Sequence, residues 1–318
     1  MKFKRYALSK LATIKYGKNQ KKVLSEDGNI PIYGTGGLMG YATTALYDKP
    51  SVLIGRKGTI GKVKYVEHPF WTVDTLFYTI INADIVIPKY LYYVMSLIDL
   101  NNYNEGTTIP SLRTETLNRL EFDIPSIEEQ EIVLSCLNPI DRKIELNNAI
   151  NNNLEEQAVV LFRSWFSAFS LSPNSPRINS EFGEIPEDFT VVKVGNLPML
   201  VTDYVANGSF ASLKANVNLY QEPNYAYFIR NTDLKSGSFG VFVDQHSYEF
   251  LSKSTLYGGE IIISNVGDVG SVFLCPKLDG RMTLGNNIIM LKPEDNHLRY
   301  YLYIWFKYLQ GQALIQGI

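Results

Sequence analysis

The sequence predicts an α+β protein in which two repeated mixed α/β domains are joined by a long coiled-coil-type helix. Three observations predict this fold. A strand pattern punctuated by glycine occurs twice, a 4-3 spacing of apolar residues lies between the two copies, and 45% of the 318 residues are apolar, which is enough for packed cores.

The repeat is clearest in two segments, SVLIGRKGTIGKV (51–63) and EIIISNVGDVGSV (260–272), which align at an offset of 209. The opening YALSKLATI of the first copy aligns with FTVVKVGNL at an offset of 183, and TVDTLFY aligns with TLGNNII at 211. The change from 183 to 209 predicts 26 extra residues in the second copy, between about Tyr204 and Leu256. The short β-rich runs and the glycines between them predict a twisted, partly open sheet in each copy.

A long helix is predicted between the copies. Apolar residues recur there with alternating steps of four and three, interrupted only by Asn147 and Asn151, and this spacing is typical of a coiled-coil seam. Asn138 is predicted to cap a new helix with Pro139 at its first position. The 28 residues 139–166 would extend about 42 Å at ~1.5 Å per residue, which exceeds what a small domain needs.

The Ser-, Pro- and Asn-rich segment 170–188 predicts a linker after this helix. The sequence is therefore divided into a first domain, a spacer helix, a linker and a second domain whose C-terminal end is incomplete relative to the first. Their predicted bounds are 1–125, 126–168, 169–188 and 189–318.

The motifs of several enzyme classes are absent from the sequence. Val63 stands where a phosphate-binding loop requires a hydroxyl, and YGTGGLMG has the wrong spacing for a dinucleotide loop. There is no Asn/Asp-Pro-Pro-aromatic methyltransferase motif, no nuclease carboxylate cluster and no supported catalytic triad. Cys136 and Cys275 lie in no ligand spacing and the three histidines stand alone, so we expect no metal site. With no signal stretch and no apolar run of about 20 residues, we expect a cytoplasmic protein that is not an enzyme.

Charge is distributed unevenly, although the net charge is only −2. The first 25 residues carry eight lysines and arginines and no acid before Glu26, and a second basic group lies at 56–64. A solvated surface is the usual explanation for such lysines, but the local absence of acids favours a nucleic-acid face. Glycine turns beside Arg, Lys, Asn and Thr also suit groove recognition, because glycine permits close backbone approach, arginine pairs with guanine and asparagine with adenine.

Three segments carry a family resemblance. EGTTIPSLRTETLNRLEFDIPSIEEQEIV (105–133) resembles the end of a target-recognition domain in the specificity subunit of type I restriction-modification systems. NPIDRKIELNNAINNNLEEQ (138–157) resembles the central spacer helix of that family, and FGEIPEDFTVVKVGNL (182–197) resembles the start of its second recognition domain.

The resemblance implies a non-catalytic subunit in which each domain recognises one half of a bipartite double-stranded DNA site. It implies docking of modification subunits, which bring S-adenosylmethionine, and of a restriction subunit, which uses ATP and magnesium. The family has a second spacer helix antiparallel to the first, and this sequence stops before a counterpart. We therefore expect the first helix to be covered by another chain: a modification subunit, a second copy, or a separately encoded C-terminal fragment.

Candidate site residues follow from the turns and from the seam. The predicted DNA-binding residues are Lys15, Lys18, Tyr33, Gly34, Thr35, Gly36, Gly37, Arg56, Lys57, Thr59, Thr107, Thr108, Asn231, Asn265, Asn286 and Asn287. The predicted subunit-docking residues, here called the seam, are Val133, Leu137, Ile140, Ile144, Leu154, Ala158, Leu161 and Trp165.

Two other functions remain open at this point. The missing helix favours a truncated, non-functional product that acts at most as an assembly scaffold or a recombination reservoir. The 21 Tyr and 16 Phe residues would suit a carbohydrate- or protein-binding β module, but most of them lie in apolar strand patterns typical of a core.

Overall fold

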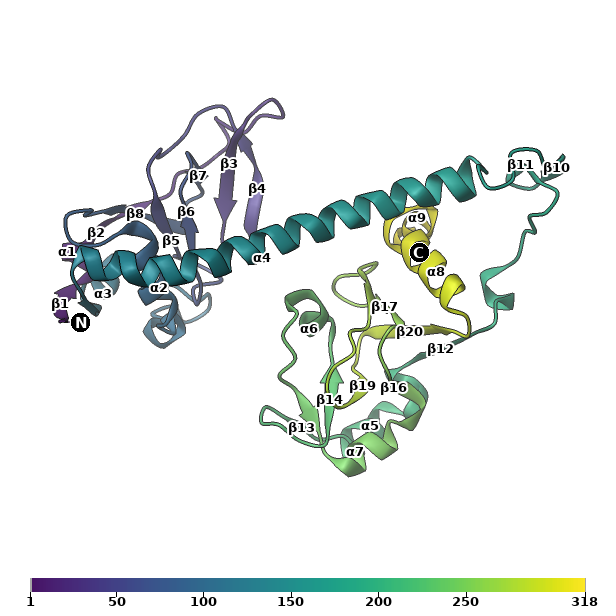
Figure 1. Cartoon of the computed structure of the whole chain (residues 1–318). Coiled ribbons are helices and arrows are strands. Elements are labelled where there is room, and N and C mark those ends of the chain that lie inside the picture. Colours follow the sequence, from purple (N-terminus) through teal and green to yellow (C-terminus); the bar gives the residue numbers. More distant parts are fainter. Residues whose placement is uncertain (1, 318) are drawn as a thin grey trace. The chain divides into compact units, whose positions relative to one another are not determined.

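A computed structural model describes residues 2–317 and divides the chain into two compact units, Met1–Asn148 and Ala149–Ile318. Both units contain helices and antiparallel sheets, and one long helix, α4 (Ile127–Phe162), runs from the first unit into the second (Figure 1). The predicted α+β fold with a long helix is confirmed.

The first unit contains two main sheets. The four-stranded sheet has the antiparallel order β2-β8-β5-β6, and the three-stranded sheet has the order β4-β3-β7, in which β3 and β7 are parallel. The terminal strands β1 and β9 pair separately. The elements are β1 (Lys4–Ala7), α1 (Leu8–Leu11), β2 (Ala12–Tyr16), β3 (Ile30–Gly34), β4 (Gly37–Ala42), β5 (Ser51–Gly55), β6 (Val63–Val66), β7 (Trp71–Thr72), β8 (Leu76–Ile81), α2 (Pro88–Ser96), η1 (Leu100–Tyr103), α3 (Thr114–Asn118) and β9 (Glu121–Ile124).

The second unit repeats the four-stranded sheet and extends the three-stranded one. Its four-stranded sheet has the order β12-β20-β17-β18, and its five-stranded sheet has the order β13-β15-β14-β19-β16, in which β14 and β19 are parallel. The elements after α4 are η2 (Arg163–Ser167), β10 (Arg177–Ser180), β11 (Gly183–Pro186), η3 (Val194–Asn196), β12 (Met199–Asp203), η4 (Tyr204–Asn207), α5 (Phe210–Asn216), β13 (Leu219–Tyr220), β14 (Ala226–Ile229), α6 (Asn231–Ser236), β15 (Phe242–Val243), α7 (Gln245–Phe250), η5 (Ser252–Ser254), β16 (Thr255–Leu256), β17 (Ile261–Ser264), β18 (Val272–Leu274), β19 (Arg281–Leu284), β20 (Ile288–Pro293), α8 (Asn296–Tyr308) and α9 (Gln310–Gln316).

Strand pairing establishes the true register of the repeat. Ile54 pairs with Val63, and Ile263 pairs with Val272, so the offset of 209 is confirmed. Tyr16 and Asp203 occupy equivalent places opposite Phe77 and Ile289, which gives an offset of 187 (203 − 16) rather than 183. The insertion in the second copy is therefore 22 residues (209 − 187) rather than 26, and the helices and strand of this stretch that have no counterpart in the first unit are α5, β13, α6 and α7.

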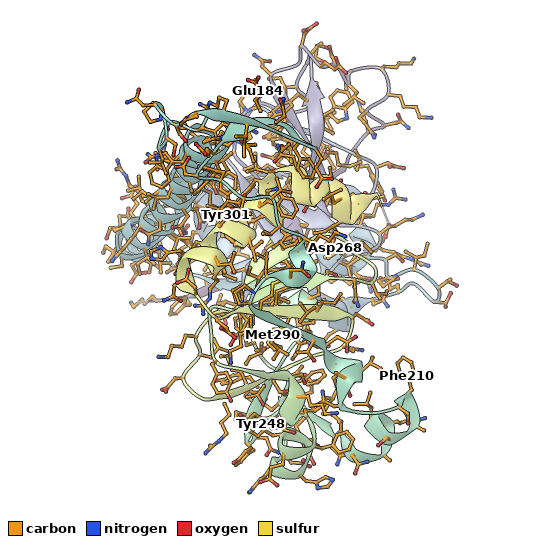
Figure 2. The ribbon with its side chains drawn as sticks, turned by 90° about the vertical axis from the view of Figure 1, so that its right-hand side faces the viewer. Glu184, Phe210, Tyr248, Asp268, Met290 and Tyr301 are labelled. Carbon is orange, nitrogen blue, oxygen red and sulfur yellow. The ribbon has the colours of Figure 1, made fainter. Side chains whose placement is uncertain are left out.

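The central strands are buried on both faces, which explains why they are continuous apolar runs. Val52 and Ile54 of β5 pack on the α2 side, whereas Leu53 packs with Tyr33 and Phe70 on the other side. In the second unit Ile261 and Ile263 pack against α8, and Met290 of β20 lies in the cluster on the opposite face (Figure 2). In both units, alternate residues of the central strand pack on opposite faces of the sheet, and this packing fixes the strand from which the β5–β6 or β17–β18 loop starts.

The expectation of a new helix beginning at Pro139 is wrong. Pro139 lies inside α4, which begins twelve positions earlier at Ile127 (139 − 127). Proline removes one main-chain donor, the one that would reach the Ser135 carbonyl. Packing of the first turns of α4 on its unit outweighs this loss, because Gln130 and Leu134 are buried there. The predicted linker also contains structure, since β10 and β11 form a hairpin within it.

Candidate nucleic-acid interface

Four segments of the first unit meet at one edge of its sheets: the β3–β4 turn, the β5–β6 loop, residues 73–75 and residues 104–112. We call them the first loop cluster. Arg56 is its centre, because its main-chain N–H donates to the Thr75 carbonyl and its carbonyl accepts from Leu112, both at 2.9 Å. Gly58 donates to the Pro110 carbonyl at 2.9 Å. Main-chain hydrogen bonds therefore join the sequence-predicted glycine loop to the TTIP segment.

The β3–β4 turn packs beside this loop. Gly34 pairs with Gly37, which leaves Thr35 and Gly36 as the two residues of the turn. Gly37 has a φ of 119°, a conformation that glycine adopts without strain. A Cβ atom at Gly58 would lie 3.8 Å from the Thr35 hydroxyl oxygen, so the predicted residues of the two turns are brought together.

The Arg56 side chain is held within the protein. Its Nη1 donates to the Asp74 carbonyl at 2.6 Å, and its guanidinium lies 5.2 Å from the centre of the Tyr16 ring. Lys57 and Thr59, by contrast, are exposed at the end of the loop. The basic loop therefore presents the Lys57 ammonium to solvent, whereas the guanidinium positions the loop.

The TTIP segment is shaped by Asn104. Its side-chain oxygen accepts from the main-chain N–H groups of Gly106 and Ser111, both at 2.9 Å. Gly106 allows the tight turn, since a Cβ atom there would lie 1.9 Å from the Ile109 carbonyl oxygen. The turn exposes Thr107 and Thr108, the two hydroxyl residues that the sequence predicts to bind DNA.

Two predicted lysines are exposed and one predicted tyrosine is not. Lys15 on β2 and Lys18 just after it both lie at the surface, and the Lys18 carbonyl accepts from the Trp71 indole at 2.8 Å. The Tyr33 ring is buried, with the Lys64 ammonium 3.9 Å from its centre. Burial raises the pKa of the Tyr33 phenol. This environment gives Tyr33 a role in packing the turn.

The second unit builds an equivalent loop with different side chains; together with residues 286–287 we call it the second loop cluster. The Asn265 N–H donates to the Asn287 carbonyl at 3.1 Å, as Arg56 does to Thr75. Asn287 has a φ of 64°, which asparagine tolerates better than most residues. Asn265, Asn286 and Asn287 are all exposed, and no hydrogen bond of their side chains is found within residues 2–317.

Asp268, labelled in Figure 2, is the acidic member of this loop and stands where the first unit has Thr59. It pairs with Lys235 and accepts from the Ser271 hydroxyl. The hydrogen bond from Lys235 lowers the pKa of the Asp268 carboxyl. Its charge is thus neutralised locally rather than projected toward an anionic ligand.

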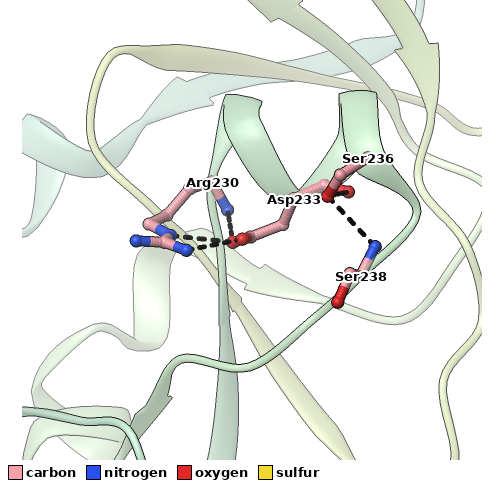
Figure 3. A network of polar contacts seen from close by, with 4 residues as sticks. All are labelled: Arg230, Asp233, Ser236 and Ser238. Carbon is pink, nitrogen blue, oxygen red and sulfur yellow. Dashed lines mark hydrogen bonds and ion pairs between the residues drawn. The ribbon is translucent and has the colours of Figure 1, made fainter. Parts of the chain in front are cut away.

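Asn231 begins α6, the helix that follows β14. Figure 3 shows the cap of this helix, in which Arg230 donates to Asp233 through its main chain at 3.0 Å and through its guanidinium at 2.6 Å. The Asn231 side-chain oxygen is buried without a hydrogen-bond partner in the described chain. Asn231 is therefore less available to a ligand than the exposed asparagines of the second loop cluster.

The first part of α4 is fixed to the first unit by polar contacts that the sequence did not reveal. The fully buried Gln130 side chain accepts from Ile87 N–H at 2.8 Å and donates to the carbonyls of Ile85 and Pro125. The sequence signal for this residue was the Glu-Gln pair in the segment 105–133, which resembles the end of a target-recognition domain. Gln130 thus holds the first turn of α4 to residues 85–87 and to Pro125, which precedes the helix.

A second tie in the first unit involves Asp141. Lys89 pairs with this carboxylate at 2.8 Å, and the Tyr93 hydroxyl donates to it. Burial opposes ionisation of Asp141, but these two partners lower its pKa. Burial and the same carboxylate raise the pKa of Tyr93.

The second part of α4 contacts α8 within the second unit. The Tyr301 ring, labelled in Figure 2, lies 4.8 Å from that of Phe162 and 4.9 Å from that of Phe166. Lys307 donates to Glu155 at 3.1 Å, and the Tyr308 hydroxyl donates to the same carboxylate. The hydrogen bond from Tyr308 lowers the pKa of Glu155, and burial raises that of Tyr308 to about 12.

The seam is largely uncovered by the described residues. Val133, Leu137 and Ala158 are half-buried, whereas Ile140, Ile144 and Leu154 are 57%, 55% and 56% exposed, and Leu161 and Trp165 are also exposed. An adjacent face exposes further large apolar residues that the 4-3 spacing did not include. These residues are Ile132, Leu146, Ile150 and Val160.

Two findings concern sites of other kinds. Within residues 2–317, no group of three or more His, Cys, Asp or Glu side chains is placed to hold a metal ion. No described helix has both the length and the apolar character needed to cross a membrane.

Comparison with known proteins identifies the first unit and most of α4. Residues 2–156 match the family described as the type I restriction modification DNA specificity domain. Residues 2–156 therefore form a type I restriction-modification DNA specificity domain. This confirms the family resemblance drawn from the sequence.

Curated specificity proteins match over part of their length. The chain is 32% identical over 158 residues to the type I restriction enzyme MjaIX specificity subunit of Methanocaldococcus jannaschii, covering 48% of this chain and 36% of that protein. It is 33% identical over 118 residues to the HindI specificity subunit of Haemophilus influenzae, covering 34% and 26%. The chain thus aligns with only about a quarter to a third of the length of these relatives.

A solved structure of a type I restriction-modification S subunit from M. genitalium aligns with the whole chain. Its TM-score is 0.49 at 17% identity, and the alignment covers 79% of that structure.

Proposed function

We propose that the chain is the DNA-recognition subunit of a type I restriction-modification complex, in which each unit binds one half of a bipartite double-stranded site. The observation that carries the proposal is the repeat of the four-stranded sheet in the same strand order, with a parallel pair in the other sheet of each unit and the same loop-anchoring hydrogen bond. The specificity-domain match covers the first of these repeats. A second copy of one binding scaffold with different loop side chains suits a second, different half-site.

The balance of basic and acidic residues differs between the two repeats, which supports different kinds of DNA contact. Residues 1–126 carry 16 Lys and Arg against 11 Asp and Glu, whereas residues 189–318 carry 10 of each. Phosphate contacts require cations and make binding sensitive to salt. The part of the first unit that precedes α4 therefore supplies most of the attraction to the DNA backbone, and residues 189–318 depend more on hydrogen bonds and shape.

Partner subunits supply the chemistry in this proposal. The chain carries no catalytic residues of its own and works in the cytoplasm with modification subunits, which use S-adenosylmethionine, and a restriction subunit, which uses ATP and magnesium. The exposed seam of α4 supports a helical partner, because apolar side chains of this size repeated along one helix are normally covered in a working protein. The occupant is a modification subunit, a second copy of the chain, or a separately encoded fragment.

The test is co-expression of the full chain with a cognate modification subunit in a host without other DNA methylation, followed by sequencing of modified adenines. The expected result is one bipartite motif, methylated in both halves, that disappears when the specificity chain is omitted. A modification subunit that methylates equally well without the chain, or shows no motif with it, would contradict the proposal. Such a result would favour the scaffold function.

A further inference from the structure

We propose that the second unit recognises an adenine together with an adjoining thymine, through Asn265 and Val266, the first two residues of the β17–β18 loop. This inference rests on the proposed function and specifies the bases that this loop binds. The β5–β6 and β17–β18 loops share the same main-chain anchor but carry different side chains. In the first unit the arginine at this position is held by the protein, whereas in the second unit the asparagine is free.

The position of Asn265 is fixed although its side chain is not. Its main-chain N–H donates to the Asn287 carbonyl at 3.1 Å, and the loop closes with a 3.0 Å bond from Gly270 N–H to the Ser264 carbonyl. The carboxamide of Asn265 is exposed and makes no hydrogen bond with other described residues. An asparagine carboxamide on a fixed backbone offers an NH2 group, which can donate to N7 of adenine, and a carbonyl oxygen, which can accept from the N6 amino group, so it matches the major-groove edge of adenine.

Val266 supplies the second part of the argument. It occupies the place of Lys57 in the first unit, and its side chain is 54% exposed. Val269, in the same loop, is 53% exposed, whereas its counterpart Ile60 is buried. Two exposed valines at a loop end have no role in the core, and an apolar side chain is the group that contacts the thymine methyl.

Asp268 does not conflict with binding of an anionic polymer at this loop. Its carboxylate pairs with Lys235 and accepts from Ser271, so its charge is compensated within the protein. Gly267, at a φ of 79°, has open space where a Cβ would be, so the loop end is free of side-chain bulk between Val266 and Asp268. The loop therefore presents a carboxamide and an apolar group without a net charge.

The experiment uses the full chain in complex with its modification subunit and a duplex library with randomised positions. The parent should enrich a bipartite motif with an A·T pair at a defined place in one half-site. Asn265→Ala should lose the preference at that pair and weaken binding to the parent motif by about 5- to 150-fold, the range for a bidentate base contact. The exposed Asn179 of the β10–β11 hairpin provides a matched control, and Asn179→Ala should keep both motif and affinity.

Modified bases test the two contacts separately, and their effect on the parent does not depend on how the variants fold. Replacing the adenine by 7-deazaadenine should weaken the parent but not Asn265→Ala. Replacing the thymine by uracil, which lacks the methyl group, should weaken the parent but not Val266→Ser. If the parent enriches a motif and both variants retain it unchanged, the inference fails while the proposed function stands. If the parent enriches no motif, both fail. If Val266→Ser loses only the modification subunit, the valine is a protein contact and the inference is overturned.

Discussion

Lys89 on α2 and Asp141 on α4 form an ion pair of 2.8 Å, and the Tyr93 hydroxyl donates to the same carboxylate. Lys307 and Tyr308 of α8 make the same pair of contacts with Glu155. Each unit thus holds its part of α4 through a carboxylate of the helix bound by a lysine and a tyrosine.

Removing the charge of Asp141 should loosen the first part of α4. Asp141→Asn replaces a charge-assisted contact in a partly buried place, and we expect a loss of about 1 to 2 kcal/mol in the free energy of unfolding of the first unit. Hydrogen exchange of the α4 amides near residue 141 is the measurement. The exposed Lys143→Ala on the same helix is the control, and equal exchange in both variants would contradict the prediction.

The capping contact of α7 should depend on pH. The main-chain N–H of Ser247 donates to the Asp244 carboxylate at 2.8 Å, and this bond is the main cause that lowers the Asp244 pKa from 3.8 to about 2. Since the folded pKa lies below the unfolded one, the stabilisation is complete above about pH 4 and is lost as the pH falls through 2. Relative to Asp244→Ala, we expect the parent to be about 1 kcal/mol more stable at pH 7.

Denaturant unfolding of both proteins from pH 7 to pH 2 measures this dependence. The stability difference should shrink across the acid range. A difference that stays constant down to pH 2 would show that the cap does not titrate.

Lys57 and Arg56 should behave differently although they are neighbours. Lys57→Ala should weaken binding to all DNA sequences alike and reduce the salt dependence by about one phosphate contact. Arg56→Ala removes the bond to the Asp74 carbonyl and the contact with Tyr16, so it should disturb the loop. If Arg56 also contacts a guanine in the bound state, the variant should lose a further ~1–3 kcal/mol of binding free energy at that one base pair. Anisotropy titrations at several salt concentrations on cognate and scrambled duplexes separate the two patterns. Arg56 would lie off the interface if Arg56→Ala bound every duplex as the parent does.

The exposed seam should make the chain associate. Ile144→Asp with Leu154→Asp introduces charge into the apolar stripe, so we expect self-association or modification-subunit binding to fall at least tenfold, as the buried apolar area is lost. Sedimentation of the purified chain with and without the subunit is the measurement. Asn148→Asp with Asn152→Asp, on exposed positions of the same helix, controls for charge. A well-folded monomer for the parent, with no binding to the subunit, would reject the prediction.

The sequence predicted the repeat better than it predicted the contacts. The register at Ile54 and Ile263 follows from an apolar run and a glycine turn, which have strong local patterns. The alignment of TVDTLFY with TLGNNII was wrong by one residue. The carbonyls of Thr75 and Asn287 accept the equivalent bonds from Arg56 and Asn265, so the true offset is 212 (287 − 75) rather than 211. A single inserted residue leaves the strand pattern intact, so only the pairing reveals it.

The contacts that each side chain makes within the protein were the feature hardest to predict from the sequence. Arg56 and Lys57 are indistinguishable as loop cations in the sequence, yet only the first finds a carbonyl and a ring nearby. On α4, the fully buried residues are Gln130 and Leu134, whereas Val133 and Leu137 are half-buried, because the face of the helix that packs on the first unit lies next to the seam. A 4-3 pattern identifies an apolar stripe, and it does not say which stripe the protein itself covers.

In both units the ends of the β5–β6 and β17–β18 loops are held by main-chain groups, from Arg56 N–H to Thr75 and from Asn265 N–H to Asn287. Any residue but proline can make that bond. Under the proposed function, point mutations at these loop ends would therefore change the DNA sequence that is recognised while the fold persists. Such a scaffold would diversify one substitution at a time, and the loop of each unit would change independently of the other.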